Sequence, residues 1–204
     1  MIDYALIDRA TRFYTDRGYQ RIETPWLVSK DIADLTKPLN ASTYIVQKDT
    51  EQKQKAFVAS GEQSFLYLIN KGYLPAVGRY QTVTPCLRDD AWDVTHMKHF
   101  IKLELIEYAA RSPSVDSLVL RENNKLYVER VVGVALSFFE TLVDKNSLEV
   151  VDTSEGYSVS YDINFNGIEI GSYGFRSCVF CDWVYATGIA EPRFSRLRNS
   201  KGLV

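Results

Sequence analysis

Apolar positions recur along this chain with two different periods, one typical of helices and the other typical of strands. Residues 2–17 carry apolar side chains at helical spacing, and Gly18 follows at the position where a helix commonly ends. The longest helical pattern covers residues 118–143, where the apolar residues fall on one broad face. A shorter helix is predicted over residues 62–70, before Lys71 and Gly72.

Runs rich in β-branched and aromatic residues, bounded by turn residues, predict the strands. These runs cover residues 19–28, 43–47, 56–59, 76–87, 100–108, 148–151, 157–164, 167–173 and 178–185. Polar residues 48–55 are expected to form a hairpin tip, and residues 88–96 a long loop between two antiparallel strands. Helices mixed with consecutive strands, without strict β–α–β alternation, predict an α+β fold: an antiparallel sheet flanked by helices.

The length and composition predict one domain that spans the whole chain. With 204 residues, no internal repeat and no linker-like segment, residues 1–204 are expected to share one core. The net charge of -2 argues against a dedicated nucleic-acid-binding protein, which usually presents a basic surface. The basic residues near the C-terminus are more typical of a solvated tail than of a binding patch.

Cysteine content and hydropathy indicate the compartment. Three cysteines, Cys86, Cys178 and Cys181, give no disulfide framework and favour a reducing environment. No apolar run approaches the ~20 residues of a membrane helix, so a cytoplasmic protein without membrane contact is expected. A zinc site at Cys178 and Cys181 is not favoured, because residues three apart on one strand point to opposite faces.

The segment from Thr84 to Leu105 carries the most chemistry in the sequence. Arg88 can pair with a phosphate through its forked guanidinium, and Phe100 offers a flat face for a purine. Asp90 follows Arg88 two residues later, and Glu104 lies in the second predicted strand. By periodicity alone, a hairpin with a surface ion pair and a core phenylalanine explains this pattern at least as well.

This segment resembles motif 2 of the class II aminoacyl-tRNA synthetases, which reads Phe-Arg-x-Glu, a loop, then His-x-x-x-Phe. Residues 93–100 are similar to the phenylalanyl type, and residues 98–105 (Lys-His-Phe-Ile-Lys-Leu-Glu-Leu) are similar to the seryl type. The resemblance implies that Arg88 holds the α-phosphate of ATP and that Phe100 stacks on adenine. It also implies that Asp90 binds the adenine amino group, although Asp90 stands where glutamate is usual.

A second segment supplies oxygen ligands and a glycine close to a possible phosphate site. Glu169 and Ser172 provide hard oxygens of the kind Mg²⁺ prefers beside phosphate oxygens. Gly188 allows the backbone to approach a ligand closely. Arg193, just after Pro192, lies where a helix begins and can reach a phosphate.

These residues are similar to the Glu-Ile-Ser-Ser strand and the Gly-x-Gly-x-x-x-x-Arg motif 3 of the seryl branch. The resemblance implies that Glu169 and Ser172 bind Mg²⁺ and that Arg193 packs on adenine and contacts the γ-phosphate. Ala186 replaces the first glycine of motif 3, and Pro192 precedes the arginine where glycine is common. Both departures bear on how a triphosphate would bind.

The stretch Ala59-Ser60-Gly61-Glu62 resembles the Thr-x-Glu loop of seryl-, threonyl- and histidyl-type enzymes. There the glutamate receives the amino group of the substrate, a role that would fall on Glu62. A glutamate favoured by the dipole at a helix N-terminus is an equally good reading of Glu62. Glu104, the second acid of motif 2, could face either a metal ion or the substrate amino group.

The order of the motifs is more specific than any single motif. Motif 1, a helix and strand that form the dimer interface in the family, matches residues 2–28; motif 2 matches residues 76–108, and motif 3 matches residues 178–197. The resemblance implies a homodimeric, ATP- and Mg²⁺-dependent ligase that activates a carboxylic acid, expected to be an amino acid, as an acyl-adenylate. Arg88, Arg193 and Glu169 would be its catalytic residues.

The resemblance leaves the acceptor open among tRNA, a protein, a carrier and a small molecule. A tRNA acceptor is possible but not favoured, because the chain is mildly acidic and 204 residues leave no room for a tRNA-binding domain. The alternative function is a non-catalytic, synthetase-like dimer that binds a ligand or regulates a partner. Asp90, Ala186 and the short final helix favour this alternative.

Overall fold

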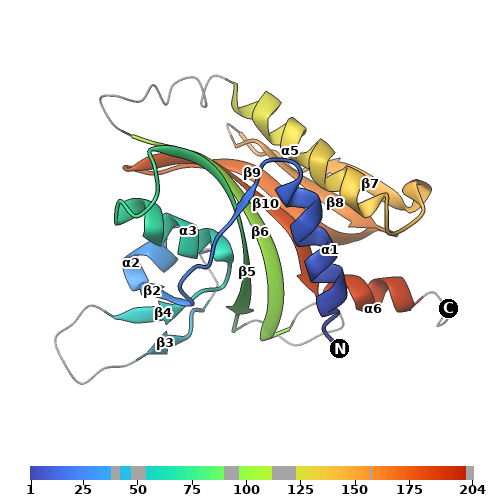
Figure 1. Cartoon of the computed structure of the whole chain (residues 1–204), viewed down its shortest axis with the longest axis horizontal. Coiled ribbons are helices and arrows are strands. Elements are labelled where there is room, and N and C mark those ends of the chain that lie inside the picture. Colours follow the sequence, from blue (N-terminus) through green and yellow to red (C-terminus); the bar gives the residue numbers. More distant parts are fainter. Residues whose placement is uncertain (38–41, 47–53, 90–96, 112–122, 157, 201–204) are drawn as a thin grey trace.

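The computed structural model describes residues 1–37, 42–46, 54–89, 97–111, 123–156 and 158–200. Its elements (Figure 1) are, in chain order, α1 (Tyr4–Thr15), β1 (Gln20–Arg21), β2 (Leu27–Ser29), α2 (Lys30–Ala33), β3 (Ile45–Val46), β4 (Lys55–Phe57), α3 (Gly61–Asn70), β5 (Val77–Leu87), β6 (His99–Ala110), α5 (Asn124–Phe139), the 3₁₀ turn η1 (Lys145–Ser147), β7 (Leu148–Asp152), β8 (Ser160–Phe165), β9 (Ile168–Ser177), β10 (Cys181–Glu191) and α6 (Arg193–Asn199).

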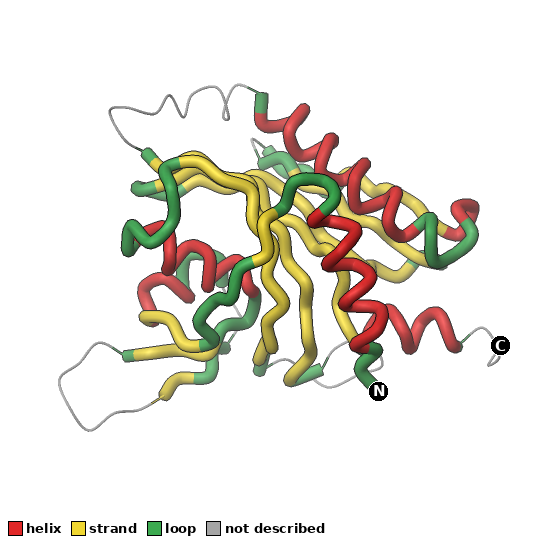
Figure 2. The backbone as a smooth tube through the Cα atoms, viewed as in Figure 1, coloured by secondary structure: helices red, strands yellow, loops and turns green. Residues whose placement is uncertain are grey.

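A seven-stranded sheet in the order β1-β5-β6-β10-β9-β8-β7 forms the frame of the molecule. Every neighbouring pair in it is antiparallel except β1 and β5, which are parallel. A second sheet in the order β2-β4-β3 lies beside α2 and α3 (Figure 2). The predicted α+β fold, an antiparallel sheet flanked by helices, is confirmed.

Each face of the large sheet carries its own hydrophobic core. Side chains alternate along a strand, so odd-numbered residues of β6 such as Leu103 and Leu105 pack with α1, α5 and α6. Even-numbered residues such as Ile106 and Tyr108 pack with α3 and the small sheet. The helices on the two sides of the sheet are visible in Figure 1. Polar side chains among the even-numbered positions therefore face α3.

The helix boundaries follow local capping. The Asp3 carboxylate accepts a hydrogen bond from the Leu6 backbone N–H at 2.9 Å and begins α1, and Gly18 takes a left-handed φ of +87° beyond its end. The Ser60 hydroxyl caps α3 in the same way, accepting from the Glu62 backbone N–H. The predicted helices over residues 2–17 and 62–70 are confirmed. Of the helix predicted over residues 118–143, α5 covers Asn124–Phe139, residues 140–143 belong to the turn that follows it, and residues 118–122 lie outside the described residues.

Two strand predictions differ from the structure. The single strand predicted over residues 19–28 is two short strands, β1 and β2, which belong to different sheets. Pro25 lies between them, and a residue without a backbone N–H cannot extend a ladder. Residues 178–180 are a turn before β10, not the start of a strand. Within the described part of the chain, no helix is long and apolar enough to cross a membrane.

Candidate active site

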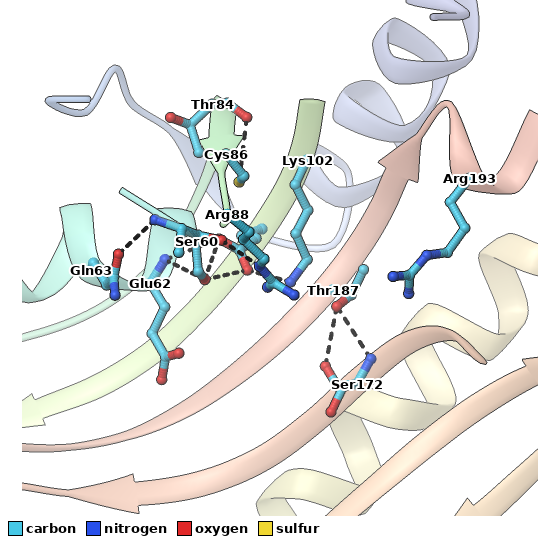
Figure 3. A network of polar contacts seen from close by, with 12 residues as sticks. Ser60, Glu62, Gln63, Thr84, Cys86, Arg88, Lys102, Ser172, Thr187 and Arg193 are labelled. Atoms are coloured by element: carbon cyan, nitrogen blue, oxygen red, sulfur yellow. Dashed lines mark hydrogen bonds and ion pairs between the residues drawn. The ribbon is translucent and has the colours of Figure 1, made fainter. Parts of the chain in front are cut away.

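A pocket of about 280 Å³ lies between the start of α3 and the sheet face that α3 covers. Residues from well-separated segments line it: Ser60 and Glu62 at the start of α3, Arg88 after β5, Lys102 and Glu104 in β6, Glu169, Ser172 and Arg176 in β9, and Tyr185 in β10. Figure 3 shows Arg88 and Lys102 converging, with Arg193 and Ser172 across from them. The fold therefore brings together most of the residues that the sequence predicts for the site.

Glu104 is the most fully bonded carboxylate of the pocket. It is only 4% exposed, and both of its oxygens accept hydrogen bonds from the Ser60 hydroxyl, at 2.7 and 2.8 Å. The Lys102 ammonium donates to it at 2.5 Å, and the Glu62 backbone N–H donates at 3.0 Å. The carboxylate thus lies at the positive end of the α3 dipole, where a negative charge is stabilised.

The surroundings of Glu104 keep it ionised. Burial alone would raise the pKa of this carboxyl, but the charge and hydrogen bond of Lys102, the Ser60 hydroxyl and the charge of Arg88 together lower it. Gly61 allows α3 to approach closely, because an added Cβ would lie 2.8 Å from a Glu104 oxygen and 2.9 Å from Thr82 Cγ2. The start of α3 and β6 therefore form one closely packed polar unit.

Arg88 and Phe100 lie next to each other, although Phe100 is not among the residues that line the pocket. The Arg88 Nε donates to the Ala59 carbonyl at 3.1 Å, and its Cζ lies 5.1 Å from the centre of the Phe100 ring. The guanidinium is thus held against the ring face expected to receive adenine. The predicted adenine ligand Asp90 lies outside the described residues.

Glu169 and Ser172 both line the pocket because β9 contains an irregularity. Ile163 of β8 pairs with Gly171 and the next residue, Asn164, pairs with Glu169, so Ile170 is an extra residue in β9. Such a bulge changes the alternation of side chains and lets residues three apart share one face. Their carboxylate and hydroxyl oxygens are ligands that Mg²⁺ accepts, so the donor set fits this ion.

Asp162, opposite Ser172 on β8, is a neighbouring carboxylate that the sequence analysis did not identify, and it is not among the residues that line the pocket. Burial raises its pKa, a hydrogen bond with Ser172 opposes the rise, and the charge of Glu169 adds to it. Along β8, polar Asp162 and Asn164 alternate with buried apolar residues. This alternation was the sequence signal that the Asp162 side chain points away from the hydrophobic core.

Arg193 and Gly188 have partners within the protein. Arg193 begins α6, and its Nη1 lies 3.3 Å from a Glu169 oxygen. Gly188 is an extra residue at a bulge in β10, where an added Cβ would lie 2.9 Å from Tyr14 Cε2 and would also overlap Leu103. The structure therefore gives Gly188 a packing role, and its predicted part in ATP binding stays a prediction.

Glu62 is held inside the protein by two donors. The Arg176 Nη1 donates to one carboxylate oxygen and the Trp183 Nε1 to the other, each at 2.6 Å. Burial raises the pKa of Glu62, and the charge of Arg176 and the Trp183 hydrogen bond oppose this rise. A substrate ammonium at Glu62 would have to share these oxygens with Arg176 and Trp183.

The sequence analysis did not identify Lys102, Arg176 or Trp183 as site residues. Lys102 is two residues from Glu104 on β6, and Arg176 is four residues from Ser172 on β9, so period-two alternation was a signal for both. Trp183 had no such signal, because its partner Glu62 is 121 positions away in the chain.

Cys178 and Cys181 flank the turn between β9 and β10. Their sulfurs lie 3.8 Å apart, and the Cys178 N–H donates to the Cys181 carbonyl at 2.9 Å. The expectation that they point to opposite faces is wrong, because they lie on either side of a hairpin turn and not along one strand. Among the described residues, no group of three or more His, Cys, Asp or Glu side chains could hold a metal ion.

Comparison with known proteins shows which solved structures share this architecture. No protein-family description matches the sequence, and no curated protein matches it. Two structures of pyrrolysyl-tRNA synthetase from Desulfitobacterium hafniense match with TM-scores of 0.70 and 0.68 and 15% and 16% identity. They match over 97% of this chain, which spans 67% and 69% of theirs.

A cytoplasmic serine–tRNA ligase from Naegleria fowleri, in complex with AMP, matches with a TM-score of 0.67 and 18% identity. The match covers 95% of this chain and 47% of that protein, so the chain spans less than half of its length. The large antiparallel sheet with flanking helices is therefore the fold of class II aminoacyl-tRNA synthetase catalytic domains.

Proposed function

We propose that this chain is an ATP- and Mg²⁺-dependent ligase that activates a carboxylic acid as its acyl-adenylate. The observation that carries the proposal is the shared pocket of Arg88, Lys102, Glu104, Glu169 and Ser172, which come from three strand regions of a synthetase fold. Cations and oxygen ligands in one pocket suit a bound triphosphate. The AMP bound to the similar serine–tRNA ligase also supports the proposal that this pocket binds a nucleotide.

In the proposed reaction, a carboxylate oxygen of the acid attacks the α-phosphorus of ATP. The bond to the bridging oxygen breaks, and pyrophosphate leaves with that oxygen. Arg88 would neutralise charge at the α-phosphate, and Arg193, released from Glu169, would bind the γ-phosphate. Glu169 and Ser172 would hold Mg²⁺, which supplies charge neutralisation on the phosphates. This chemistry requires positioning and charge stabilisation but no covalent nucleophile on the protein.

The second step would transfer the acyl group to a hydroxyl, amine or thiol and release AMP. The acceptor could be a tRNA, a protein, a carrier or a small molecule, and tRNA is not favoured because the chain is mildly acidic. A homodimer formed through residues 2–28, a single domain over residues 1–204 and a cytoplasmic location complete the proposal.

A non-catalytic ligand-binding or regulatory dimer is the second candidate. It is favoured by contacts that already occupy residues predicted to act on substrates: Glu62 is bonded to Arg176 and Trp183, and Arg193 is paired with Glu169. Such a protein would bind ATP or another ligand without breaking a phosphoanhydride bond.

ATP–pyrophosphate exchange with Mg²⁺ and pools of carboxylic acids, including the twenty amino acids, tests the proposal without knowledge of the acceptor. We expect exchange with at least one pool. Arg88→Ala should reduce the exchange rate about 10²- to 10³-fold, because it removes a charge that stabilises the transition state. Lys125→Ala, which removes an exposed lysine on α5 outside the proposed dimer segment, is the control and should exchange like the wild type.

Two results would contradict the proposal. Full exchange activity in Arg88→Ala would contradict the assignment of the α-phosphate site. ATP binding by calorimetry, with no exchange from any acid, would select the non-catalytic function.

A further inference from the structure

The end of the pocket formed by β9 and β10 is built around one guanidinium. Arg176 pairs with Glu62 through Nη1, and its Cζ lies 4.2 Å from the centre of the Tyr185 ring. Trp183 holds the second Glu62 oxygen. One edge of the guanidinium is therefore fixed by an ion pair and one face by an aromatic ring, so its position is set before any ligand binds.

Every carboxylate that lines the described part of the pocket already has a donor. Glu62 is bonded to Arg176 and Trp183, Glu104 to Ser60 and Lys102, and Glu169 to Arg193. A substrate ammonium would therefore have to share these oxygens with the donors that already bind them. Each of these carboxylates is already paired with a cation, so an added ammonium would lie next to a like charge, which is unfavourable.

Arg176, in contrast, has donors to spare. A guanidinium carries five N–H groups, and Glu62 accepts from Nη1. The side chain lines the pocket and keeps 37% of its surface exposed, whereas that of Glu62 keeps 7%. Part of the side chain is therefore exposed to the pocket, and the planar arrangement of the guanidinium N–H groups matches a carboxylate.

We infer that the acid activated in this pocket carries a second carboxylate, which Arg176 binds while the reacting carboxylate lies near Arg88. The inference rests on the proposed function and names its substrate class: dicarboxylic acids, with or without an α-amino group. Glu62 is then a positioning residue that orients Arg176. This role replaces the predicted one, in which Glu62 receives the amino group of the substrate. An α-ammonium is not needed for recognition.

The test compares acids that differ in the second carboxylate. Succinate, glutarate, adipate, aspartate and glutamate are each assayed by ATP–pyrophosphate exchange against butyrate, valerate, hexanoate and alanine. We expect kcat/KM to be at least about 10-fold higher for one of the dicarboxylic acids than for its matched monoacid, since hydrogen bonds between charged groups have effects of this size. Aspartate and glutamate, set against succinate and glutarate, show whether the amino group contributes.

Variants separate recognition from folding. Arg176→Gln should raise the KM for the dicarboxylic acid about 10- to 100-fold and leave the KM for ATP within about twofold, because only the acid loses a partner. Arg176→Gln combined with Glu62→Gln removes both charges and avoids an unpaired buried carboxylate, and it should show the same loss. Arg79→Gln is the control, because Arg79 also pairs with a buried glutamate but lies outside the pocket.

Preference for a monoacid, or an unchanged KM for the dicarboxylic acid in both Arg176 variants, would overturn the inference. If no acid supports exchange, the proposed adenylation fails, and calorimetry with the same dicarboxylic acids then decides the inference alone. Binding to the wild type that is lost in Arg176→Gln would support the dicarboxylate site. Absence of binding to the wild type would overturn it.

Discussion

Strand β6 carries two buried glutamates three residues apart, and the pleat of the sheet sends them to opposite faces. Glu104 faces α3 and lines the pocket. Glu107 accepts hydrogen bonds from the Tyr19 hydroxyl at 2.6 Å and from Arg130, and pairs with Arg79 at 3.4 Å. Both are almost fully buried and both meet cations, yet of the two Glu104 lines the pocket described above and Glu107 is not among its lining residues.

The difference shows that a buried charge can serve to join elements of the fold without lining the candidate site. The partners of Glu107 come from the turn after α1, from α5 and from β5, so this residue ties three elements together. Burial raises the pKa of Tyr19, and the charge of Glu107 adds to this effect, so the tyrosine keeps the proton it donates. The partners of Glu104 instead belong to the pocket itself.

The largest effect that would sharpen this comparison is on activity. In Glu104→Gln, one carboxylate oxygen becomes an amide nitrogen, which cannot accept a hydrogen bond from the Ser60 hydroxyl. The variant also leaves Lys102 without its anionic partner. We expect ATP–pyrophosphate exchange to fall about 10²-fold, because the charges around the reacting phosphate lose their fixed positions. Wild-type exchange rates in a folded Glu104→Gln protein would break the contrast between the two glutamates.

Glu107→Gln should reduce the stability of the fold and leave the exchange activity unchanged. It removes the charge that pairs with Arg130 and Arg79 and weakens the acceptor of Tyr19. We expect the free energy of unfolding to fall by about 2 kcal/mol, as for other lost hydrogen bonds to charged groups. Urea denaturation measures this loss, and the exchange rate per folded molecule should stay unchanged. A specific loss of exchange would assign Glu107 to the site.

Two glycine substitutions should have effects of opposite sign. Gly61→Ala would push a methyl group against Glu104 and Thr82, and we expect a loss of at least about 1 kcal/mol from this overpacking. Gly133→Ala, on the exposed face of α5 with nothing within 4 Å, should stabilise the protein by about 0.5–1 kcal/mol through helix propensity. Thermal unfolding of both variants checks the signs. A stabilising Gly61→Ala would refute the close approach of α3 to β6.

The smallest expected effect is on the pH dependence of stability. The folded pKa of Glu104 lies below its usual 4.5, because Lys102, Ser60 and Arg88 outweigh burial, so its contribution is complete above pH 4.5 and is lost as the pH falls toward the folded pKa. The folded pKa of Glu62 is raised by burial, so its contribution is largest below pH 4.5 and decreases as the pH rises through the folded pKa.

Glu104→Gln should therefore flatten the loss of stability below pH 4.5, and Glu62→Gln should flatten the decrease above it. Urea denaturation from about pH 3 to about pH 7 measures both slopes. Equal slopes in the two variants and the wild type would show that neither glutamate has a shifted pKa.

Local patterns predicted much of the fold. The amphipathic helix before Gly18 and the alternating strands on either side of the motif 2 loop are determined by neighbours in the chain, and both are found as α1, β5 and β6. The split of residues 19–28 into two sheets was not predictable in this way, since the pairing partners of β1 and β2 lie in β5 and β4.

For the candidate site, too, some features follow from the local sequence and others depend on the tertiary structure. The sequence by itself determined which residue types occur at motif spacing, and so placed Arg88, Phe100, Glu104, Glu169 and Ser172 in one predicted site. Only the tertiary structure decided what each charge meets. Arg176 and Trp183 reach Glu62 across more than one hundred positions of chain, and the bulge in β9 turns Glu169 and Ser172 to one face. Periodicity reports the direction of a side chain within its own strand, whereas an ion pair depends on the register between strands and on the packing of a helix over them.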